Sequence, residues 1–338
     1  MKKVLVTGVS GFVGQHCAVE LLKAGYSVKG SVRSMAKAEH ITKSLGEVVE
    51  TEGRLEFCEL NLLEDRGWEE SMTDCDYLLH VASPYVGKEP KDEDDLIRPA
   101  TEGTIRALKA AHKAGVKKVV LTSSMVAMLG EMNGSIPIEQ NTWTNSNSKN
   151  ASAYVKSKTI AERMAWDFMD DLKRSDQMQL VVVNPGPIFG PTISGNLTGE
   201  SMTMSKNMIT GKMPMLPKAG INMTDVRDVA RIQVLALENE KANGQRFVVA
   251  SQNAYTFKQV AQILKDAGYD KVSTKEAPNW FLKLMANFSP DLKGMKPFIG
   301  SIYDANLTPT MEVFDWTPIT IEKTMIDTAE SIEKVLKG

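Results

Sequence analysis

The sequence predicts an α/β fold: a doubly wound parallel sheet of the Rossmann type, with a smaller mixed lobe formed mainly by the C-terminal part. Over the first 185 residues, short β-branched segments alternate with longer helical segments, and a glycine-rich turn joins the first strand to the first helix. Buried strands that alternate with helices are typical of a parallel sheet covered by helices on both faces.

The elements follow one another in a regular order along the chain. Strands are expected at 4–7, 27–32, 55–59, 77–81, 116–123 and 180–184, and helices at 12–24, 92–114 and 151–174. Beyond Pro185, further prolines divide the chain into short pieces, although a helix at 225–238 and a strand at 246–250 fit the sheet layer. We therefore expect a Rossmann domain at 1–185, to which 223–251 returns, and a substrate-binding lobe at 186–222 and 252–338. A cleft between the two is where a substrate is expected.

Composition excludes several classes of protein. The chain has 338 residues and a formal net charge of −2, which argues against nucleic acid or an anionic membrane as the main partner. Three scattered cysteines fit neither a disulfide framework nor a zinc site, and no metal site is expected. No run of about 18 apolar residues is present, and no export signal is recognisable. We expect a cytoplasmic protein that is a monomer or a homodimer.

The glycine-rich turn after the first strand is the first functional motif. Gly8, Gly11 and Gly14 are spaced three apart, which suits a tight turn, a close approach of backbone to a pyrophosphate, and packing of helix on strand. A helix N-terminus then faces the phosphates. The alternative is a turn that binds no ligand. The expected cofactor contacts here are Thr7, Gly8, Ser10, Gly11, Phe12, Val13 and Gly14.

The end of the second strand indicates which dinucleotide is bound. An acid about 20 residues after the glycines usually binds the ribose 2′-hydroxyl of NAD. Here Arg33 stands 19 residues after Gly14, and Lys37 follows four residues later. A guanidinium beside an ammonium suits a 2′-phosphate, so NADP(H) is favoured over NAD(H). The alternative is a pair of solvated surface cations.

A Tyr/Lys pair carries the predicted chemistry. Tyr154 and Lys158 are four residues apart and share a helix face, directly after the strand that ends in Thr122, Ser123 and Ser124. The spacing alone arises readily by chance, but its position is informative, because the pair opens the helix that follows the fifth strand. Reduction of a carbonyl needs a proton donor and a second group to hold the oxygen. We assign Tyr154 as the donor, Lys158 as the cation that lowers its pKa, and Ser124 as the oxygen-binding group; Ser124 could instead cap the backbone.

Together, the glycine turn, the Thr-Ser-Ser strand end and Tyr154-x-x-x-Lys158 make the chain resemble the extended short-chain dehydrogenase/reductases over nearly its whole length. Within them it is similar to the branch of dihydroflavonol and cinnamoyl-CoA reductases, which includes aldehyde and methylglyoxal reductases. The resemblance implies the roles given above for Ser124, Tyr154, Lys158 and Arg33. Further expected cofactor contacts are Asn61, Leu62, Val81, Ala82, Ser83, Thr122, Pro185, Gly186 and Ile188, and expected substrate contacts are Tyr85, Ser124, Met125, Met128, Tyr154, Gly186 and Met215.

Departures from the branch narrow the expected substrate. Asn61 stands where the family has an aspartate that binds adenine. The segment 150–155 lacks the aromatic and cysteine residues typical of cinnamoyl-CoA reductases, and 125–128 lacks the asparagine by which flavonoid reductases bind a phenolic ring. A small aldehyde or ketone is therefore the expected substrate. His80 is expected to contribute backbone to the site, with a catalytic base as its alternative.

Two other functions remain open on this scaffold. A redox-neutral epimerase or dehydratase, or a hydroxysteroid-type dehydrogenase, would use the same fold. Many nucleotide-sugar enzymes keep NAD bound, whereas Arg33 and Lys37 favour NADPH. A non-catalytic NADP(H) sensor is the alternative from a different class, and the Tyr/Lys pair argues against it.

Overall fold

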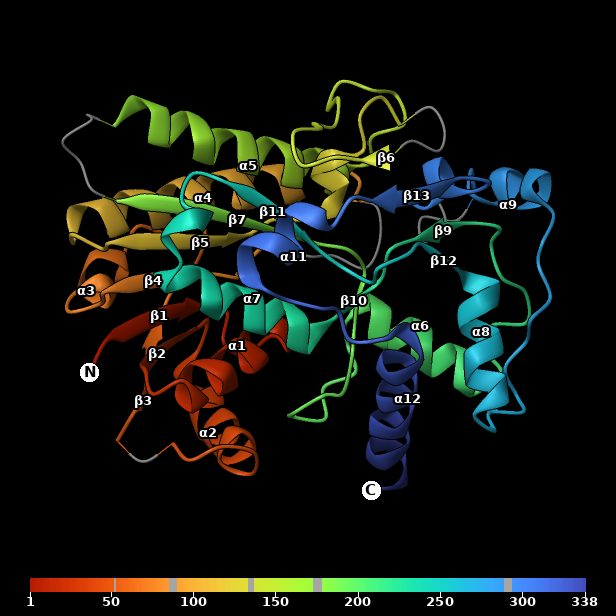
Figure 1. Cartoon of the computed structure of the whole chain (residues 1–338), viewed down its shortest axis with the longest axis horizontal. Helices are drawn as coiled ribbons and strands as arrows, with labels where there is room; N and C mark the ends of the chain where they lie inside the picture. Colours follow the sequence, from red (N-terminus) through yellow and green to blue (C-terminus); the bar gives the residue numbers. More distant parts are fainter. Residues whose placement is uncertain (52, 85–89, 133–136, 173–177, 289–293) are drawn as a thin grey trace.

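The computed structural model describes residues 1–51, 53–84, 90–132, 137–172, 178–288 and 294–338. Its centre is a seven-stranded parallel sheet in the order β3-β2-β1-β4-β5-β7-β11 (Figure 1). The strands are β1 (Lys3–Thr7), β2 (Ser27–Val32), β3 (Leu55–Glu59), β4 (Tyr77–His80), β5 (Lys118–Thr122), β7 (Gln179–Pro185) and β11 (Arg246–Val249). The order reverses between β1 and β4, as in a doubly wound sheet.

Helices cover both faces of this sheet. The helices of one face are α1 (Phe12–Lys23), α2 (Ala38–Gly46) and α7 (Val226–Glu238), and those of the other are α3 (Trp68–Met72), α4 (Asp94–Lys113) and α5 (Ala153–Asp171) (Figure 1). Side chains alternate between the two faces, so Val4 and Val6 belong to one buried apolar cluster and Leu5 to the other. The sheet is therefore buried on both sides, which explains its continuous apolar strands.

The predicted fold class is confirmed. The strands expected at 27–32 and 55–59 have those bounds, and the other expected strands and helices differ by one to three residues at their ends where the structure describes them. The helix expected at 151–174 is observed as Ala153–Asp171, and residues 173–177 lie outside the described part. Such end differences are ordinary, because caps rather than periodicity set where a helix ends.

The smaller part contains a four-stranded mixed sheet in the order β12-β9-β13-β6. Here β12 (Tyr255–Thr256) is antiparallel to β9 (Gly220–Ile221), while β13 (Ile302–Ala305) is parallel to both β9 and β6 (Pro137–Ile138). Since β6 comes from the region assigned by sequence to the Rossmann domain, that region also contributes a strand to the smaller sheet. A separate two-stranded pair joins β8 (Ile188–Phe189) to β10 (Thr224–Asp225).

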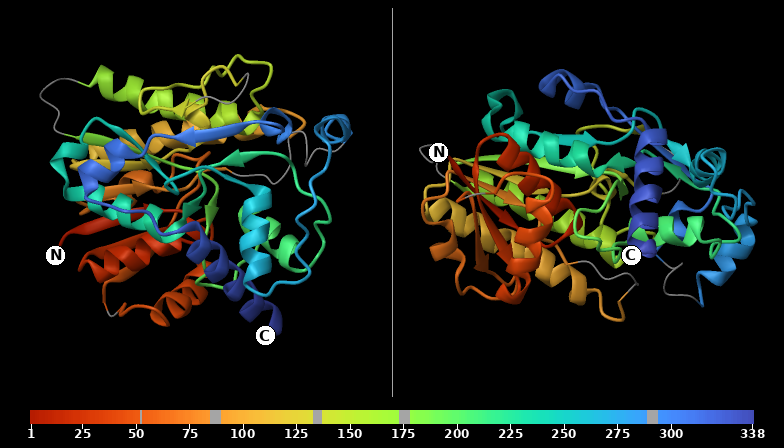
Figure 2. Two further views of the ribbon diagram at one scale, coloured as in Figure 1. Left: turned by 45° about the vertical axis from the view of Figure 1, so that its right-hand side comes forward. Right: turned by 90° about the horizontal axis from the view of Figure 1, so that it is seen from below.

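Helices α6 (Glu200–Ile209), α8 (Phe257–Asp266) and α12 (Ile321–Lys337) lie together in the smaller part (Figure 2). Their buried side chains contribute to a third apolar cluster. Its members include Met202, Met208 and Met223, which are almost fully buried. The remaining helical elements are η1 (Met35–Lys37), η2 (Met125–Met128), η3 (Glu240–Ala242), α9 (Asn279–Met285), η4 (Lys296–Phe298) and α11 (Thr308–Phe314).

The buried carboxylate of Asp225 connects the two parts. It caps the start of α7, accepts from the Arg227 guanidinium, and accepts from the Thr324 hydroxyl of α12 at 2.8 Å. Arg227 also bonds Asp327 of α12 at 2.6 Å. In the described residues, no helix is long and apolar enough to cross a membrane.

Two histidines are buried in the uncharged form. Burial lowers the pKa of His16 to about 4, and its Nε2 lies 2.9 Å from the Pro191 carbonyl oxygen. Burial also lowers the pKa of His80 to about 3, with a smaller contribution from the nearby Lys158 ammonium. An unfolded histidine takes up a proton near pH 6.5, so both residues favour the folded state less as the pH falls below that value.

We predict that the free energy of unfolding decreases by about 1.4 kcal/mol per buried histidine between pH 7.5 and pH 5.5, because only the unfolded chain is protonated there. His16→Gln keeps a donor toward Pro191 without the titration, so this variant should lose less stability over the same interval. Urea unfolding at both pH values measures this. The matched control is His40→Gln at an exposed position, and equal pH dependence of wild type and His16→Gln would contradict the prediction.

Candidate active site

The carboxyl ends of β1, β4, β5 and β7 meet at one edge of the sheet. The chain leaves β1 toward β2 and leaves β4 toward β5, so a crevice forms where the order reverses. The glycine turn follows β1, and Val81, Ala82 and Ser83 follow β4 as its neighbour. The predicted dinucleotide-binding segments are thus adjacent in space.

The glycine positions of this turn have no room for a side chain. Gly8 has a φ of +70°, and a Cβ there would lie 3.1 Å from Ala82. A Cβ on Gly14 would lie 2.3 Å from the carbonyl oxygen of Gly8, so only glycine fits at this position in the first turn of α1. Gly11 caps α1 without a side chain, and the first N–H groups of the helix face the crevice. This cradle fits the pyrophosphate of a dinucleotide.

The Thr7 hydroxyl connects the ends of β1 and β4. It accepts from the backbone N–H groups of Val81 and Ala82, each at 3.0 Å, and lies 3.0 Å from Nδ1 of His80. With both lone pairs occupied, the hydroxyl donates to Nδ1, so the neutral His80 ring carries its proton on Nε2. The buried ring thus orients the Thr7 hydroxyl, which holds the segment after β4 in place.

The end of β2 is attached to the same turn. The Ser31 hydroxyl accepts from the Gly8 N–H at 3.1 Å, and its carbonyl accepts from Val9 at 3.1 Å. Arg33 follows directly and is exposed, as is Lys37. The two do not share an α-helical turn, because η1 begins only at Met35. Among the described residues neither cation has an ion-pair partner.

Asn61 and Leu62 lie in the turn after β3. The Asn61 side chain accepts from the Leu63 N–H at 3.1 Å and donates to Glu64 at 2.5 Å, so it stabilises the turn. Leu62 packs near Gly103 of α4, where a Cβ would lie 2.7 Å from it. Asn61 is exposed, and its assignment to adenine remains a prediction.

Ser124 and Tyr154 are brought together from two elements. Ser124 caps η2 through its hydroxyl, which accepts from the Val126 N–H at 3.3 Å. Tyr154 lies in the first turn of α5, which Ser152 caps. Burial raises the pKa of Tyr154 to about 12, while a hydrogen bond with Ser124 lowers it and the charge of Glu200 raises it. The expectation that Lys158 lowers this pKa is therefore outweighed, and the phenol is protonated at neutral pH.

Lys158 is buried one turn further along α5. Burial lowers the pKa of its ammonium to about 8, although Glu162 acts in the opposite direction. Its Nζ donates to the Thr122 carbonyl at 3.5 Å. Among the described residues the Thr122 hydroxyl is buried and has no hydrogen-bond partner. A polar atom without a partner beside Lys158 fits a site completed by a polar ligand.

The predicted substrate contacts are distributed unevenly. Met125 and Met128 are fully buried in an apolar cluster, whereas Met215 is 44% exposed. Gly186 is tightly enclosed, since a Cβ there would lie 2.1 Å from the Asn222 carbonyl oxygen and 3.0 Å from the Met125 sulfur. Tyr85 lies outside the described residues. Pro185 ends β7 beside Gly186, and Ile188 begins β8, both near the same edge.

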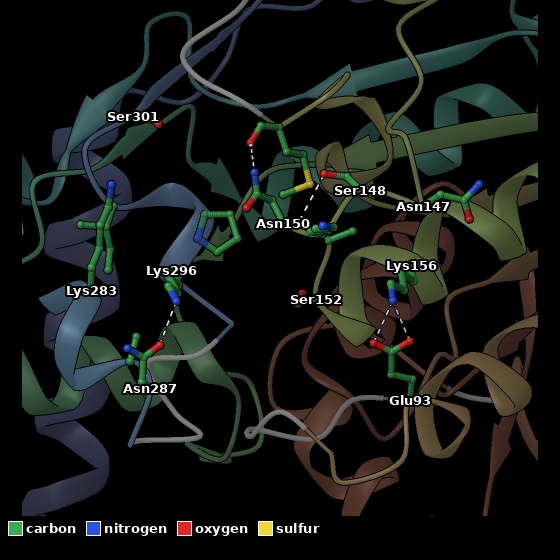
Figure 3. Close-up of a pocket in the computed structure, with 16 residues that line it drawn as sticks. Glu93, Asn147, Ser148, Asn150, Ser152, Lys156, Lys283, Asn287, Lys296 and Ser301 are labelled. Carbon is green, nitrogen blue, oxygen red and sulfur yellow. Dashed lines mark hydrogen bonds and ion pairs between the residues drawn. The ribbon is translucent and has the colours of Figure 1, made fainter.

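A cavity of about 740 Å³ lies beside the first turn of α5 (Figure 3). One wall carries Ser152, Lys156 and Glu93, and the opposite wall carries Lys283 and Lys296 (Figure 3). Both Glu93 oxygens bond Lys156, at 2.7 and 2.8 Å. With Lys149, the lining holds four lysines and one acid, so it is strongly cationic. The predicted substrate residues that the structure describes do not line this cavity.

Several contributing residues were not recognised in the sequence. Ser31 orders the glycine turn, and a buried group behind the Tyr/Lys pair consists of Ser123, Glu162, Asn184 and Arg246. Glu162 follows Lys158 by four residues, which was the one available sign of its position. Nothing local distinguishes it from a surface glutamate of a helix.

Comparison with known proteins identifies the family of this chain. The model of the NAD dependent epimerase/dehydratase family matches residues 4–250. The chain is 32% identical over 286 residues to an NADPH-dependent methylglyoxal reductase of Saccharomyces cerevisiae, covering 78% of this chain and 82% of that protein. It is also 32% identical over 272 residues to a cinnamoyl-CoA reductase of Medicago truncatula, covering 78% and 80%.

The same similarity extends to solved structures. A crystal structure of the yeast methylglyoxal/isovaleraldehyde reductase complexed with NADPH superposes with a TM-score of 0.81, at 25% identity, over 99% of each chain. The glycine cradle, the strand order and these matches over most of the sequence lead to one conclusion: the chain belongs to the NAD dependent epimerase/dehydratase family, the extended short-chain dehydrogenase/reductases.

Proposed function

We propose that the chain is an NADPH-dependent reductase that converts a small aldehyde or ketone to an alcohol, with Tyr154 as the proton donor. The observation that carries this proposal is the hydrogen-bonded pair of Ser124 and Tyr154 beside the buried Lys158, at the sheet edge that holds the dinucleotide cradle. The relatives named as NADPH-dependent reductases support it.

Ser124, Tyr154 and Lys158 each have a separate role in the reduction of the carbonyl group. Bound NADPH supplies the hydride. Ser124 donates a hydrogen bond to the carbonyl oxygen of the substrate, and Tyr154 transfers a proton to that oxygen. Tyr154 holds this proton at neutral pH because its pKa is raised. The Lys158 ammonium favours loss of that proton as negative charge develops on the oxygen. Since burial holds the pKa of Lys158 at about 8, this assistance should decline above that pH.

The choice of cofactor follows from the end of β2. Arg33 and Lys37 are exposed beside the turn that Ser31 attaches to Gly8, and they offer a fork and a point charge to a 2′-phosphate. Binding of NADPH in preference to NADH favours a reductase that consumes its cofactor over a redox-neutral epimerase.

The cationic cavity favours a particular charge on the substrate. Ser152 and Lys156, which line it, flank Tyr154 in the first turn of α5. A carbonyl compound that also carries a negative group would place that group among the lysines. We therefore propose a preference for anionic over neutral carbonyl substrates of equal shape.

We predict that Tyr154→Phe lowers kcat for aldehyde reduction by about 100-fold or more, because a positioned proton donor typically contributes that much. NADPH binding, measured by fluorescence titration, should stay within about twofold of wild type. Tyr269→Phe, remote from the site, is the matched control. Full turnover by a folded Tyr154→Phe protein would refute the mechanism.

We predict that Arg33→Ala raises KM for NADPH by roughly 10- to 100-fold and leaves KM for NADH nearly unchanged, since a charge-assisted bond contributes about 1.5–3 kcal/mol. Initial rates with each cofactor test this, with the exposed Arg231→Ala as control. An unchanged ratio between the two cofactors would remove Arg33 from the 2′-phosphate site.

We predict a higher kcat/KM for 4-carboxybenzaldehyde than for 4-methylbenzaldehyde. The combined Lys283→Ala and Lys296→Ala substitutions should reduce only the former, by roughly 3- to 10-fold, because exposed charges contribute modestly. Added salt should have the same selective effect. Lys334→Ala in α12 is the control, and equal losses for both substrates would argue against an anionic preference.

A further inference from the structure

A buried carboxylate lies directly behind the proposed catalytic group. Glu162 of α5 is 1% exposed and follows Lys158 by one helical turn. Its Oε2 accepts from the Ser123 hydroxyl at 2.5 Å and from the Asn184 amide at 2.8 Å, and its Oε1 accepts from the Arg246 Nε at 2.7 Å. The partners thus come from the residue that follows β5 and from strands β7 and β11.

The cation of this group is itself held firmly. The Arg246 guanidinium donates to the Thr142 carbonyl at 2.7 Å and lies 3.7 Å from the centre of the Trp143 ring. Its side chain is 7% exposed and that of Glu162 is fully buried. A buried ion pair often stabilises a fold no better than apolar residues of the same size. Its presence here suggests a role beyond stability.

The group has two connections to the reacting residues. The Asn184 amide that donates to Glu162 also donates to the Ser124 carbonyl at 3.2 Å, so the carboxylate orients the residue that holds Ser124. Along α5, the charge of Glu162 opposes the effect of burial on Lys158 and favours its ammonium form. One carboxylate therefore acts on both the backbone of Ser124 and the charge of Lys158.

We propose that Glu162 is a positioning residue of the reductase site, which keeps Lys158 charged and fixes Ser124 through Ser123 and Asn184. This assignment rests on the proposed function. Arg246 compensates the buried charge of Glu162, and the two neutral partners supply hydrogen bonds to its other oxygen.

Few charged groups surround Lys158 and Glu162. Lys158 is near Glu162 on its own helix, the Thr122 carbonyl of β5, and His80 of β4, which is neutral. Glu162 faces Ser123, Asn184 and Arg246, and the Arg163 guanidinium lies 4.5 Å from the centre of the Trp143 ring. Among the described residues, no ionisable group of α4, which packs along α5, bonds to either. Removal of the Glu162 charge should therefore act on Lys158 and on its ion-pair partner Arg246.

The test is the pH profile of kcat/KM for aldehyde reduction by Glu162→Gln. Glutamine keeps an acceptor for Ser123 and Asn184 but lacks the charge, so Lys158 should lose its proton at lower pH. We expect the alkaline limb to move down by about one pH unit and kcat/KM at pH 8 to fall about fivefold. Asp167→Asn, an exposed acid on the same helix, should leave the profile unchanged.

A purely structural role predicts a different result. In that case Glu162→Gln would lower the melting temperature while the alkaline limb stayed in place, and the proposal would be overturned. If Glu162→Gln does not fold, the double variant Glu162→Gln/Arg246→Met removes both charges without leaving one unpaired, and the same shift is expected of it. A wild-type protein that reduces no carbonyl would instead refute the proposed function, and this assignment with it.

Discussion

The contact between Gly14 and the carbonyl oxygen of Gly8 determines how the rest of the site is arranged. Because no side chain fits between them, the first turn of α1 packs against the glycine turn after β1 and directs its first N–H groups into the crevice. The same close packing brings Gly8 against Ala82, so the segments after β1 and β4 form one surface. Hydrogen bonds of Thr7 to the segment after β4, and of Ser31 to Gly8, then fix both neighbours of that surface.

Burial acts on the two ionisable groups of the site in opposite directions. It raises the pKa of the Tyr154 phenol and lowers that of the Lys158 ammonium, because low polarity disfavours the charged form of each. Both groups are therefore nearer to neutrality than in water. Glu162, which is paired with Arg246, places a negative charge next to this region. Because the partners of Glu162 come from the packed sheet, the electrostatics of the site depend on that packing.

Much of the fold could be predicted because its cause is local. The strand at 27–32 is a short segment between turns, and the helix after Gly11 follows directly from the glycine turn at its start. The pairing of β6 with β13 could not be predicted, since two-residue strands show no periodicity and their residues are 167 apart in register. The site divides in the same way: Tyr154 and Lys158 follow from their spacing, whereas the raised pKa of Tyr154 follows from its surroundings.

The sequence by itself determined the fold class, the glycine turn, the cation at the end of the second strand and the Tyr/Lys pair, because spacing within one element decides each of them. Only the tertiary structure decided which distant side chains meet. Thr7 and His80 are 73 residues apart, and Glu162 and Arg246 are 84 apart. No local preference of the chain encodes such contacts. They arise when the packed sheet and helices bring distant polar groups together in a buried place, where each group needs a hydrogen-bond partner.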